Sequence, residues 1–547
     1  MNTARRETDW PLWCGLGFGI MCCLAPLASV QHLPFVDLPG HMGFVGAQVH
    51  EAEPAARISR YYTIDVRLIP TVLYEALAYI AYPYIAIETF TRLFIAAFAI
   101  LGLPLAMVYA LRVFGRDQRL ALLVLPLLYH RCLWYGFIDY CSALPFLILA
   151  LALLTRSLQA FSWPRCLALA LASVATVAGH AFVAMVLFGL AALLVLAHGD
   201  RAMRERRQFS SVQMQSSKAA LGLLPAGLYL ASWFMQGVKE SDGNKSLLGD
   251  VLQARHSLVK SASLFYEWSL GSLKGWQSDA PILVLVANLV LVGVWAARHR
   301  AGNDDMPKEH RWPLMLLLVT TLVFLLLPMR ILSPLDWWAV SVRLVVPIWL
   351  FLILTLPRAR TRLPIQLFLP VLAATLFQGV VLTRDFVRFE RQDMAHFDQA
   401  IAAIPPGARL LGLWPVIPEL QRYRDEPLRH VANYYVVRQG GVARTSLVGN
   451  SRQNWVHPKA ELPSPQQSHL RSFRWKDHGG YYDYFLLRDP VEGRDDLPGG
   501  LHDAPAGELS LVGRFGLWRL WKRLEDTTGK KGGAAGFMPA GQNPQSG

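Results

Sequence analysis

Three carboxylates and several histidines follow the first apolar run of the chain within one short stretch, QHLPFVDLPGHMGFVGAQVHEAEP, residues 31–54. Asp37 and His41 are one helical turn apart in spacing, and Glu51 and Glu53 come near the end of the stretch. Carboxylates near hydrocarbon are costly unless they are hydrated, paired or used in chemistry. A carboxylate at such a place can take the proton of a reacting hydroxyl or amine, which is general base catalysis. The stretch is therefore a candidate catalytic site.

A structural role explains the same residues. Asp37 and His41 can cap a helix that has Pro39 in its first turn. Glu51 and Glu53 fit a solvated face of that helix better than a catalytic pair. Both interpretations of Asp37 stay open at this point, and they differ in whether the protein needs Asp37 for activity.

The composition is that of a membrane protein. The chain has 547 residues, of which 53% are hydrophobic and 17% charged, and its mean hydropathy is +0.30. Soluble domains carry about 25% charged residues. Apolar runs of roughly 17–25 residues, each long enough to span hydrocarbon, recur from Pro11 to Leu382. The first run has no small-residue cleavage site and is flanked by Arg5 and Arg6, so we expect a first span with the N-terminus in the cytoplasm.

Arginines cluster in the short loops between the apolar runs. This positive-inside pattern accounts for much of the net charge of +14, so a nucleic-acid partner is not expected. With those loops inside the cell, spans are predicted at 11–30, 90–112, 119–134, 138–155, 165–179, 181–198, 218–235, 281–298, 312–329, 340–357 and 364–383. Their number is odd, which places the tail outside the cytoplasm. We expect the protein in the inner (plasma) membrane.

Two regions complete the predicted organisation. Segment 68–87 is apolar but does not fit as a full span, so it is interpreted as a juxtamembrane or re-entrant helix or as half of a tight hairpin. We therefore expect an α-helical polytopic membrane protein with about 11–13 transmembrane helices. Residues 1–384 form the transmembrane module, with an outer loop at 31–65.

The composition changes after Arg384, and a small α/β domain is predicted over residues 385–523. We expect Trp414, Tyr484 and Phe485 in its core. Residues 524–547 have few apolar side chains to bury and are predicted to be disordered. The strand-like stretches of this region are 408–414, 430–437, 481–488 and 515–524.

The region after the first span resembles the GT-C superfamily of membrane glycosyltransferases, which includes protein mannosyltransferases, oligosaccharyltransferases and lipid A aminoarabinose transferases. The resemblance rests on DLPGHMGFVGAQV, on IPTVLYEALAYI and on TFTRLFIAAFAILGLPLAMVYALRVFGRD, all within residues 31–120. The tail, with DQAIAAIPPGARLL and YYDYFLLRD, is similar to the family's outer C-terminal domain. Leu38 stands where many members have a second acidic residue, so the double-acidic metal motif is missing. No cofactor is expected, although a divalent metal stays open.

The resemblance implies transfer of a sugar from a polyprenyl-phosphate carrier to a glycan, lipid or protein acceptor on the outer face. It makes Asp37 the candidate general base and His41 a candidate for orienting it.

The donor phosphate would need cations at the membrane surface. Arg330 and Arg343 flank the predicted outer loop, Arg67 borders segment 68–87, and His180 interrupts an apolar run at its outer end. Arginines at a membrane edge also snorkel to the interface without binding anything, and a histidine can simply close a helix end. Arg343 is the strongest candidate because it lies one turn inside an apolar span.

Two other functions fit the same composition. A lipid-linked substrate transporter or flippase would hold ionisable groups near the bilayer midplane, often in broken helices of inverted repeats. Here the ionisable residues gather at one face, and no repeat is visible. A non-catalytic membrane protein of envelope assembly would use its tail as a binding module, and Asp37 would then be dispensable.

Overall fold

The computed structural model describes residues 9–204, 209–239, 257–299, 312–331, 337–358, 361–443, 455–459, 470–492 and 499–524. The chain divides into two compact units. The helical unit comprises the described residues of Met1–Ala28, Leu68–Tyr74 and Arg92–Arg384. The sheet unit comprises those of Ser29–Arg67, Glu75–Thr91 and Asp385–Gly547. The loop after the first span thus clusters with the tail, whereas the sequence assigns it to the transmembrane module.

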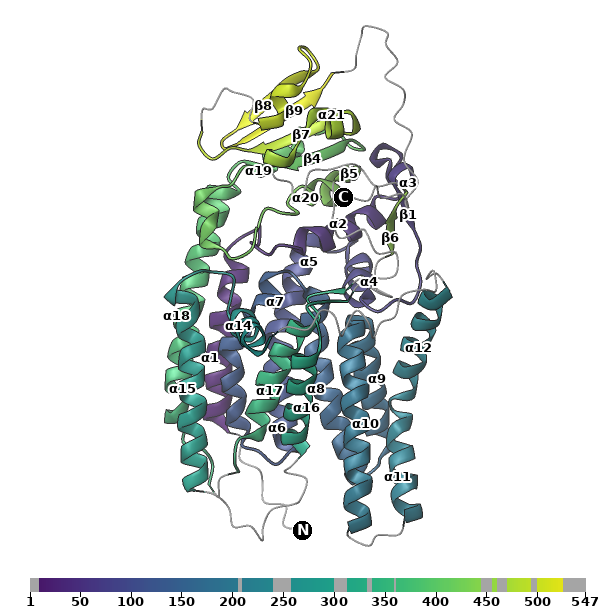
Figure 1. The fold of residues 1–547 in the computed structure, drawn as a ribbon, viewed down its shortest axis with the longest axis vertical. Coiled ribbons are helices and arrows are strands. Elements are labelled where there is room, and N and C mark those ends of the chain that lie inside the picture. The colour runs from purple at the N-terminus through teal and green to yellow at the C-terminus, as the bar shows by residue number, and fades with distance from the viewer. Residues whose placement is uncertain are drawn as a thin grey trace. The chain divides into compact units, whose positions relative to one another are not determined.

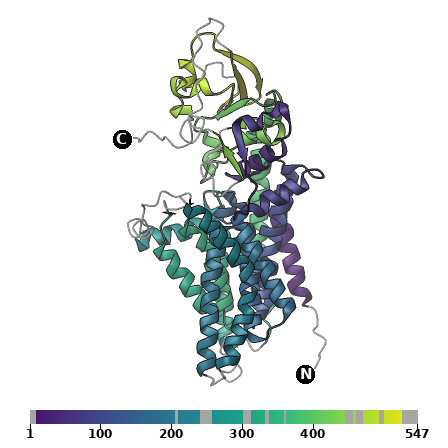
Figure 2. The same ribbon diagram turned by 90° about the vertical axis from the view of Figure 1, so that its right-hand side faces the viewer.

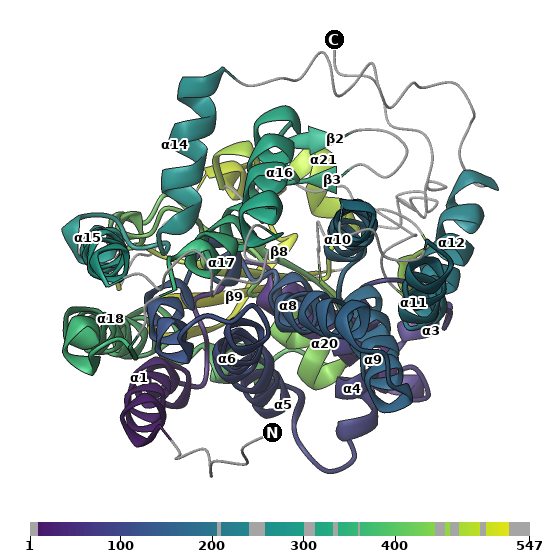
Figure 3. The same ribbon diagram turned by 90° about the horizontal axis from the view of Figure 1, so that it is seen from below.

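Long apolar helices make up the helical unit and run alongside one another (Figure 1 and Figure 2). Its principal helices are α1 (Trp10–Ala28), α6 (Leu103–Val113), α8 (Ile138–Gln159), α9 (Trp163–Gly179), α10 (Ala181–Arg204), α11 (Phe209–Leu221), α12 (Leu224–Lys239), α14 (Leu258–Ser269), α15 (Trp276–Arg298), α16 (Trp312–Leu326), α17 (Val345–Thr355) and α18 (Leu369–Arg388). The most buried of its long spans, α8, packs against α6, α9 and α10 (Figure 3).

Six helices in the described part of the chain are long and apolar enough to cross a membrane, or seven if one bent pair is a single span. This is the pattern of a multi-pass membrane protein. The six are Trp10–Ala28, Ile87–Val113, Ile138–Gln159, Ala181–Asp200, Trp276–Arg298 and Ile365–Asp393. The bent pair, Gln213–Leu221 and Leu224–Gln236, corresponds to the predicted span 218–235.

Four predicted spans are shorter helices in the structure. They correspond to Gln118–Leu127, Trp163–Gly179, Trp312–Leu326 and Ser341–Thr355. A helix of fifteen residues is only about 22 Å long, which is less than the roughly 30 Å of hydrocarbon. Proline contributes to the shortening, because Pro126 lies inside the first of these helices, which is of the tight 3₁₀ type, and Pro328 follows the end of α16.

The sheet unit is a mixed α/β fold. Its principal elements are α2 (Leu38–Val49), α3 (Ile58–Tyr61), α19 (Phe397–Ala402), α20 (Asn433–Gln439), α21 (Trp475–His478), β1 (Tyr62–Ile64), β4 (Arg409–Leu413), β5 (Val442–Ala443), β6 (Val456–Pro458), β7 (Tyr484–Arg488), β8 (Leu509–Phe515) and β9 (Trp518–Arg523). Its main sheet has the order β5-β4-β7-β9-β8 (Figure 1). β4 pairs in parallel with β5 and β7, whereas β9 pairs antiparallel with β7 and β8.

Three of the predicted strands are confirmed as β4, β7 and β9, and Trp414, Tyr484 and Phe485 are all buried. The strand prediction for 430–437 is wrong, because most of that stretch belongs to α20. Its run of tyrosines and valines has strand propensity, but tertiary packing overrides such propensities. The predicted disordered tail lies outside the described residues from 525 onward.

A cluster of charged groups ties together segments of the sheet unit that are far apart in sequence. His32 Nδ1 lies 3.1 Å from Glu390 Oε1, and its Nε2 lies 3.0 Å from Asp398 Oδ1. Arg438 donates to Asp398 at 2.6 Å and to Glu88 at 3.1 Å. Burial alone would lower the pKa of His32, but Asp398 and Glu390 outweigh burial and raise it. Burial also opposes ionisation of Asp398, yet His32 and Arg438 lower its pKa to about 2.

These shifts predict a pH-dependent loss of stability on His32→Gln. A histidine with a raised pKa contributes stability that is fully present below its unfolded pKa of about 6.5 and is lost as the pH rises through the folded value. Hydrogen bonds to charged groups contribute roughly 1.5–3 kcal/mol, so His32→Gln should destabilise the protein by about that much at pH 6 and by less at pH 9. Thermal unfolding at both pH values measures this, with the exposed His502→Gln as the control. Equal losses at pH 6 and pH 9 would contradict the assigned role of His32.

Candidate active site

Asp37 immediately precedes α2, at the position where a helix cap is expected. Its side chain makes no capping hydrogen bond, and its backbone is already helical, with φ −89° and ψ −9°. Pro39, in the first turn, has no N–H to satisfy. The Asp37 carboxylate is nonetheless only 6% exposed. Its burial therefore has a cause other than capping.

Two histidines lie beside this carboxylate. His430 Nε2 is 3.3 Å from Asp37 Oδ1, and His430 is itself buried. His41 lies one turn into α2, where its N–H donates to the Asp37 carbonyl at 3.1 Å. The Phe44 ring meets the His41 ring edge-on. Sequence spacing brings Asp37 and His41 together, whereas His430 arrives from the tail.

Burial determines the charge state of His41. Burial lowers the pKa of His41 to about 4, with the Asp37 charge opposing this shift and His430 adding to it. At neutral pH His41 is therefore an uncharged imidazole, which can donate or accept a hydrogen bond but brings no positive charge. Within the described residues, His430 is the ion-pair partner of Asp37.

The site is assembled where α2 packs on α20. A Cβ on Gly46 would lie 2.6 Å from the Cα of Val437, and one on Gly43 would lie 3.0 Å from Asn433 Oδ1. These two glycines therefore let the backbones approach closely. At the end of α2, His50 Nε2 lies 3.0 Å from the Val437 carbonyl oxygen. This contact lies at the end of α2 opposite Asp37.

The two glutamates of the opening stretch lie elsewhere. α2 ends at Val49, so Glu51 and Glu53 follow the helix. The prediction that they form a solvated face of that helix is wrong. Both are exposed, and Glu53 Oε1 lies 3.0 Å from His50 Nδ1. They are at the opposite end of α2 from Asp37.

A further buried carboxyl, Glu75, lies on α4 (Val72–Ala81) and was not singled out from the sequence. Gln48 donates to its Oε2 at 3.3 Å. Burial raises the pKa of Glu75 to about 8, although hydrogen bonds from Gln48 and the Trp455 backbone oppose the shift. At neutral pH this carboxyl is therefore mostly protonated, and in that form it cannot accept a proton as a general base.

Two of the predicted substrate-binding residues meet in the helical unit through Tyr140. The Tyr140 hydroxyl donates to the Arg343 carbonyl at 2.5 Å, and its ring lies edge-on to His180 at 5.9 Å. The Arg343 guanidinium donates to the Trp338 carbonyl at 3.0 Å and lies 4.8 Å from the centre of the Phe137 ring. His180 ends α9 and accepts a hydrogen bond from the backbone of the residue after next.

The other two predicted cations belong to different units. Arg330 is exposed on β2 (Arg330–Ile331), which pairs with β3 (Trp337–Trp338). Arg67 belongs to the sheet unit, where its Nε lies 3.4 Å from Asp65 Oδ2 and its carbonyl accepts from the Trp455 indole at 2.7 Å. The structure thus joins Arg343 with His180 through Tyr140, and it places Arg330 opposite Trp338, whose carbonyl accepts from Arg343.

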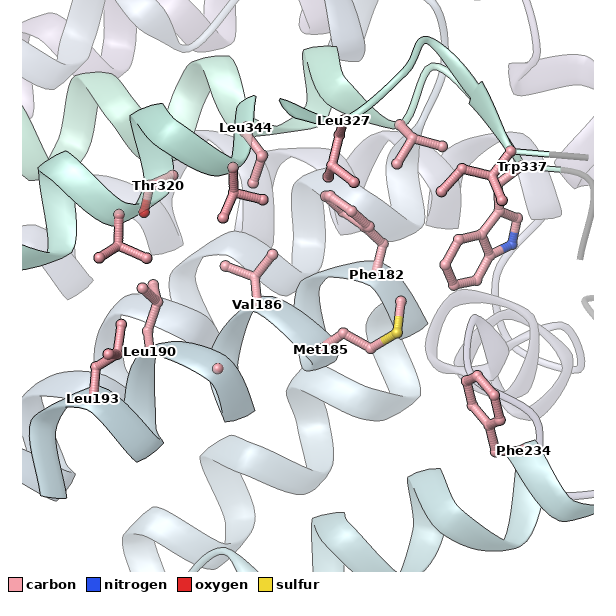
Figure 4. Close-up of a pocket in the computed structure, with 15 residues that line it drawn as sticks. Phe182, Met185, Val186, Leu190, Leu193, Phe234, Thr320, Leu327, Trp337 and Leu344 are labelled. Carbon is pink, nitrogen blue, oxygen red and sulfur yellow. The ribbon is translucent and has the colours of Figure 1, made fainter. Parts of the chain in front are cut away.

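An apolar cavity of about 530 Å³ opens in the helical unit (Figure 4). Side chains of α10 form one wall, among them Phe182, Val186 and Leu190, and residues of α16 form another. Trp337 and Leu344 also line it, and they neighbour Trp338 and Arg343 in the sequence. The polar group that includes His180 and Arg343 is therefore adjacent in the chain to the lining of an apolar cavity.

No group of three or more His, Cys, Asp or Glu side chains in the described part of the chain is arranged to hold a metal ion. No protein-family model matches the chain, and no curated protein matches it.

The contact between α2 and α20 predicts that Gly46→Ala destabilises the sheet unit. The added methyl group would meet main-chain atoms of Val437, which cannot move aside as a flexible side chain would. Overpacking of this kind costs roughly 1–3 kcal/mol. Gly17→Ala is the matched control, because a Cβ at that position on α1 meets nothing within 4 Å. Thermal unfolding of the purified variants measures the difference, and a Gly46→Ala protein as stable as Gly17→Ala would contradict the packing.

Proposed function

We propose that the protein is a membrane glycosyltransferase of the GT-C type, which moves a sugar from a polyprenyl-phosphate carrier to an acceptor on the outer face of the membrane. One observation carries the proposal: the Asp37 carboxylate is buried, makes no capping hydrogen bond and lies beside His430. It occupies the position at which the resemblance places the catalytic base. A buried carboxylate that its helix does not use is suited to take up a proton in a reaction.

In the proposed reaction Asp37 removes the proton of an acceptor hydroxyl. The acceptor oxygen forms a bond to the anomeric carbon of the sugar as the bond from that carbon to the phosphate oxygen breaks. The bonding electrons leave with the polyprenyl phosphate, and the proton stays on Asp37 until solvent takes it. His41, which is neutral at neutral pH because burial lowers its pKa to about 4, can orient the acceptor by hydrogen bonding without adding charge.

The helical unit supports the donor half of the proposal. Its cavity of about 530 Å³ is within the range of roughly 300–1,000 Å³ that is typical of ligand pockets, and its lining is almost entirely apolar. An isoprenoid chain is an apolar ligand of that kind. Arg343 follows a stretch that lines the cavity and carries the charge that a phosphate needs. Within the helical unit, we propose the cavity as a site for an isoprenoid chain and Arg343 as a ligand for a phosphate.

The scaffold alternative assigns Asp37 to helix capping alone. Capping by aspartate works through a hydrogen bond from the side-chain oxygen to a backbone N–H in the first turn, and that bond is missing here. Burial of the Asp37 carboxylate beside His430 costs desolvation free energy, and a helix cap does not require that burial. This observation favours a catalytic role over the scaffold alternative.

The test is sugar transfer by the purified protein from polyprenyl-phosphate sugars to a panel of glycan, lipid and peptide acceptors. Asp37→Asn keeps the shape of the side chain but removes the proton acceptor, so the rate should fall by roughly 10²–10⁴-fold with little change in melting temperature. Glu53→Gln, an exposed carboxylate of the same loop, is the matched control and should transfer normally. Arg343→Gln should raise the KM for the donor more than it lowers kcat.

Near-normal transfer by Asp37→Asn would remove Asp37 from the mechanism. A wild-type protein that binds no polyprenyl phosphate and transfers no sugar to any acceptor would overturn the glycosyltransferase proposal itself.

A further inference from the structure

The tail contributes a residue to the site that the loop alone does not supply. His430 precedes α20, and its Nε2 lies 3.3 Å from Asp37 Oδ1. Both side chains are buried, with exposed fractions of 3% for His430 and 6% for Asp37. In a buried environment an ion pair or hydrogen bond of this kind has a strong influence on side-chain orientation because water does not compete for it.

The backbone around His430 is fixed from two directions. The His430 carbonyl accepts hydrogen bonds from the backbone N–H and from the side-chain Nδ2 of Asn433, each at 3.0 Å. The Asn433 side chain in turn packs on Gly43, where any Cβ would lie 3.1 Å from the Asn433 Cβ. Asn433 therefore links the turn that carries His430 to the helix that Asp37 begins.

His430 reaches the Asp37 carboxylate directly, with its Nε2 3.3 Å from Oδ1. His41 is on the helix that Asp37 begins and has its own place in the reaction, at the acceptor. The arrangement leaves one imidazole on each of two elements around a single carboxylate. The imidazole from the tail contacts Oδ1 of that carboxylate.

We propose that His430 is a positioning residue for Asp37: its Nε2 holds Oδ1, so that Oδ2 is aimed at the acceptor's proton. This inference rests on the proposed transferase activity, and it adds that the tail completes the site. The sheet unit is then part of the catalytic machinery rather than a separate binding module. Residues of this kind orient a reacting group, and their loss commonly lowers activity by about 10–100-fold.

The test compares His430→Ala, His430→Gln and Asp37→Asn in the full-length purified protein. His430→Ala should lower kcat by about 10–100-fold while the KM for the polyprenyl-phosphate donor stays within about twofold. His430→Gln restores a nitrogen donor of similar reach and should recover most of the lost rate. The double variant Asp37→Asn, His430→Ala should be no slower than Asp37→Asn alone, because residues that act as a unit are not additive.

His50→Ala is the matched control for stability. His50 is also a buried histidine of the sheet unit with a carboxylate 3.0 Å away, but it lies at the other end of α2. Its loss should lower the melting temperature with turnover unchanged. If His430→Ala behaves like His50→Ala, or if His430→Gln is as slow as His430→Ala, the positioning role is wrong while the transferase activity stands.

A readout without turnover separates this inference from the proposed function. The melting temperatures of wild type, Asp37→Ala, His430→Ala and the corresponding double variant form a cycle, because Asp37→Ala removes the whole carboxylate. The two single losses should not add, because each removes one half of the same contact. Coupled melting temperatures in a protein with no transferase activity would retain the pair and overturn the proposed function. Strictly additive losses would overturn the pair.

Discussion

The close approach of α2 and α20 is the contact on which the candidate site depends. Gly46 has no Cβ, and the backbone of Val437 occupies the space where a Cβ would be. Gly43 also has no Cβ, and the Asn433 side chain occupies the space where that Cβ would be. These two contacts bring the turn that carries His430 beside the start of α2, where Asp37 lies. A side chain larger than hydrogen at Gly46 would push the two helices apart and separate the carboxylate from its imidazole.

Several buried charges in the described part of the sheet unit are paired, and these pairs join segments that are distant in sequence. Arg422 contacts Asp385 and Asp393 at 2.8 and 3.2 Å, and Asp393 also accepts from Arg488 at 3.0 Å. The His32 cluster joins the segment after the first span to the tail in the same way. An unpaired buried charge costs several kcal/mol, so these pairs favour one arrangement of the loop and the tail. Asp37 fits this pattern as well, because its carboxylate has His430 Nε2 at 3.3 Å.

Local signals in the sequence predicted much of the fold. Composition and apolar runs indicated a multi-pass membrane protein, and three strands of the tail followed from their hydrophobic pattern. Helix length was harder to predict, because an apolar run does not reveal where a 3₁₀ turn or a proline ends the helix. The spacing of Asp37 and His41 marked half of the candidate site. His430 was missed because it lies in HVANYYVV, which has strand propensity, and its contact with Asp37 spans most of the chain. The three-residue spacing of Gly43 and Gly46 was the available signal for a closely packed partner helix.

The most direct test of this account is a disulfide between α2 and α20. A Cβ on Gly43 would lie 3.1 Å from the Asn433 Cβ, close to the roughly 3.5–4.5 Å of a disulfide. In a background without the native cysteines, the Gly43→Cys, Asn433→Cys protein should oxidise readily, and its thiols should resist maleimide labelling until they are reduced. Gly480→Cys with Asn433→Cys is the control pair, because a Cβ at Gly480 has only an Arg523 side-chain atom within 4 Å. Rapid labelling of both cysteines in the Gly43–Asn433 pair under oxidising conditions would contradict the contact between α2 and α20 and, with it, the site formed by Asp37 and His430.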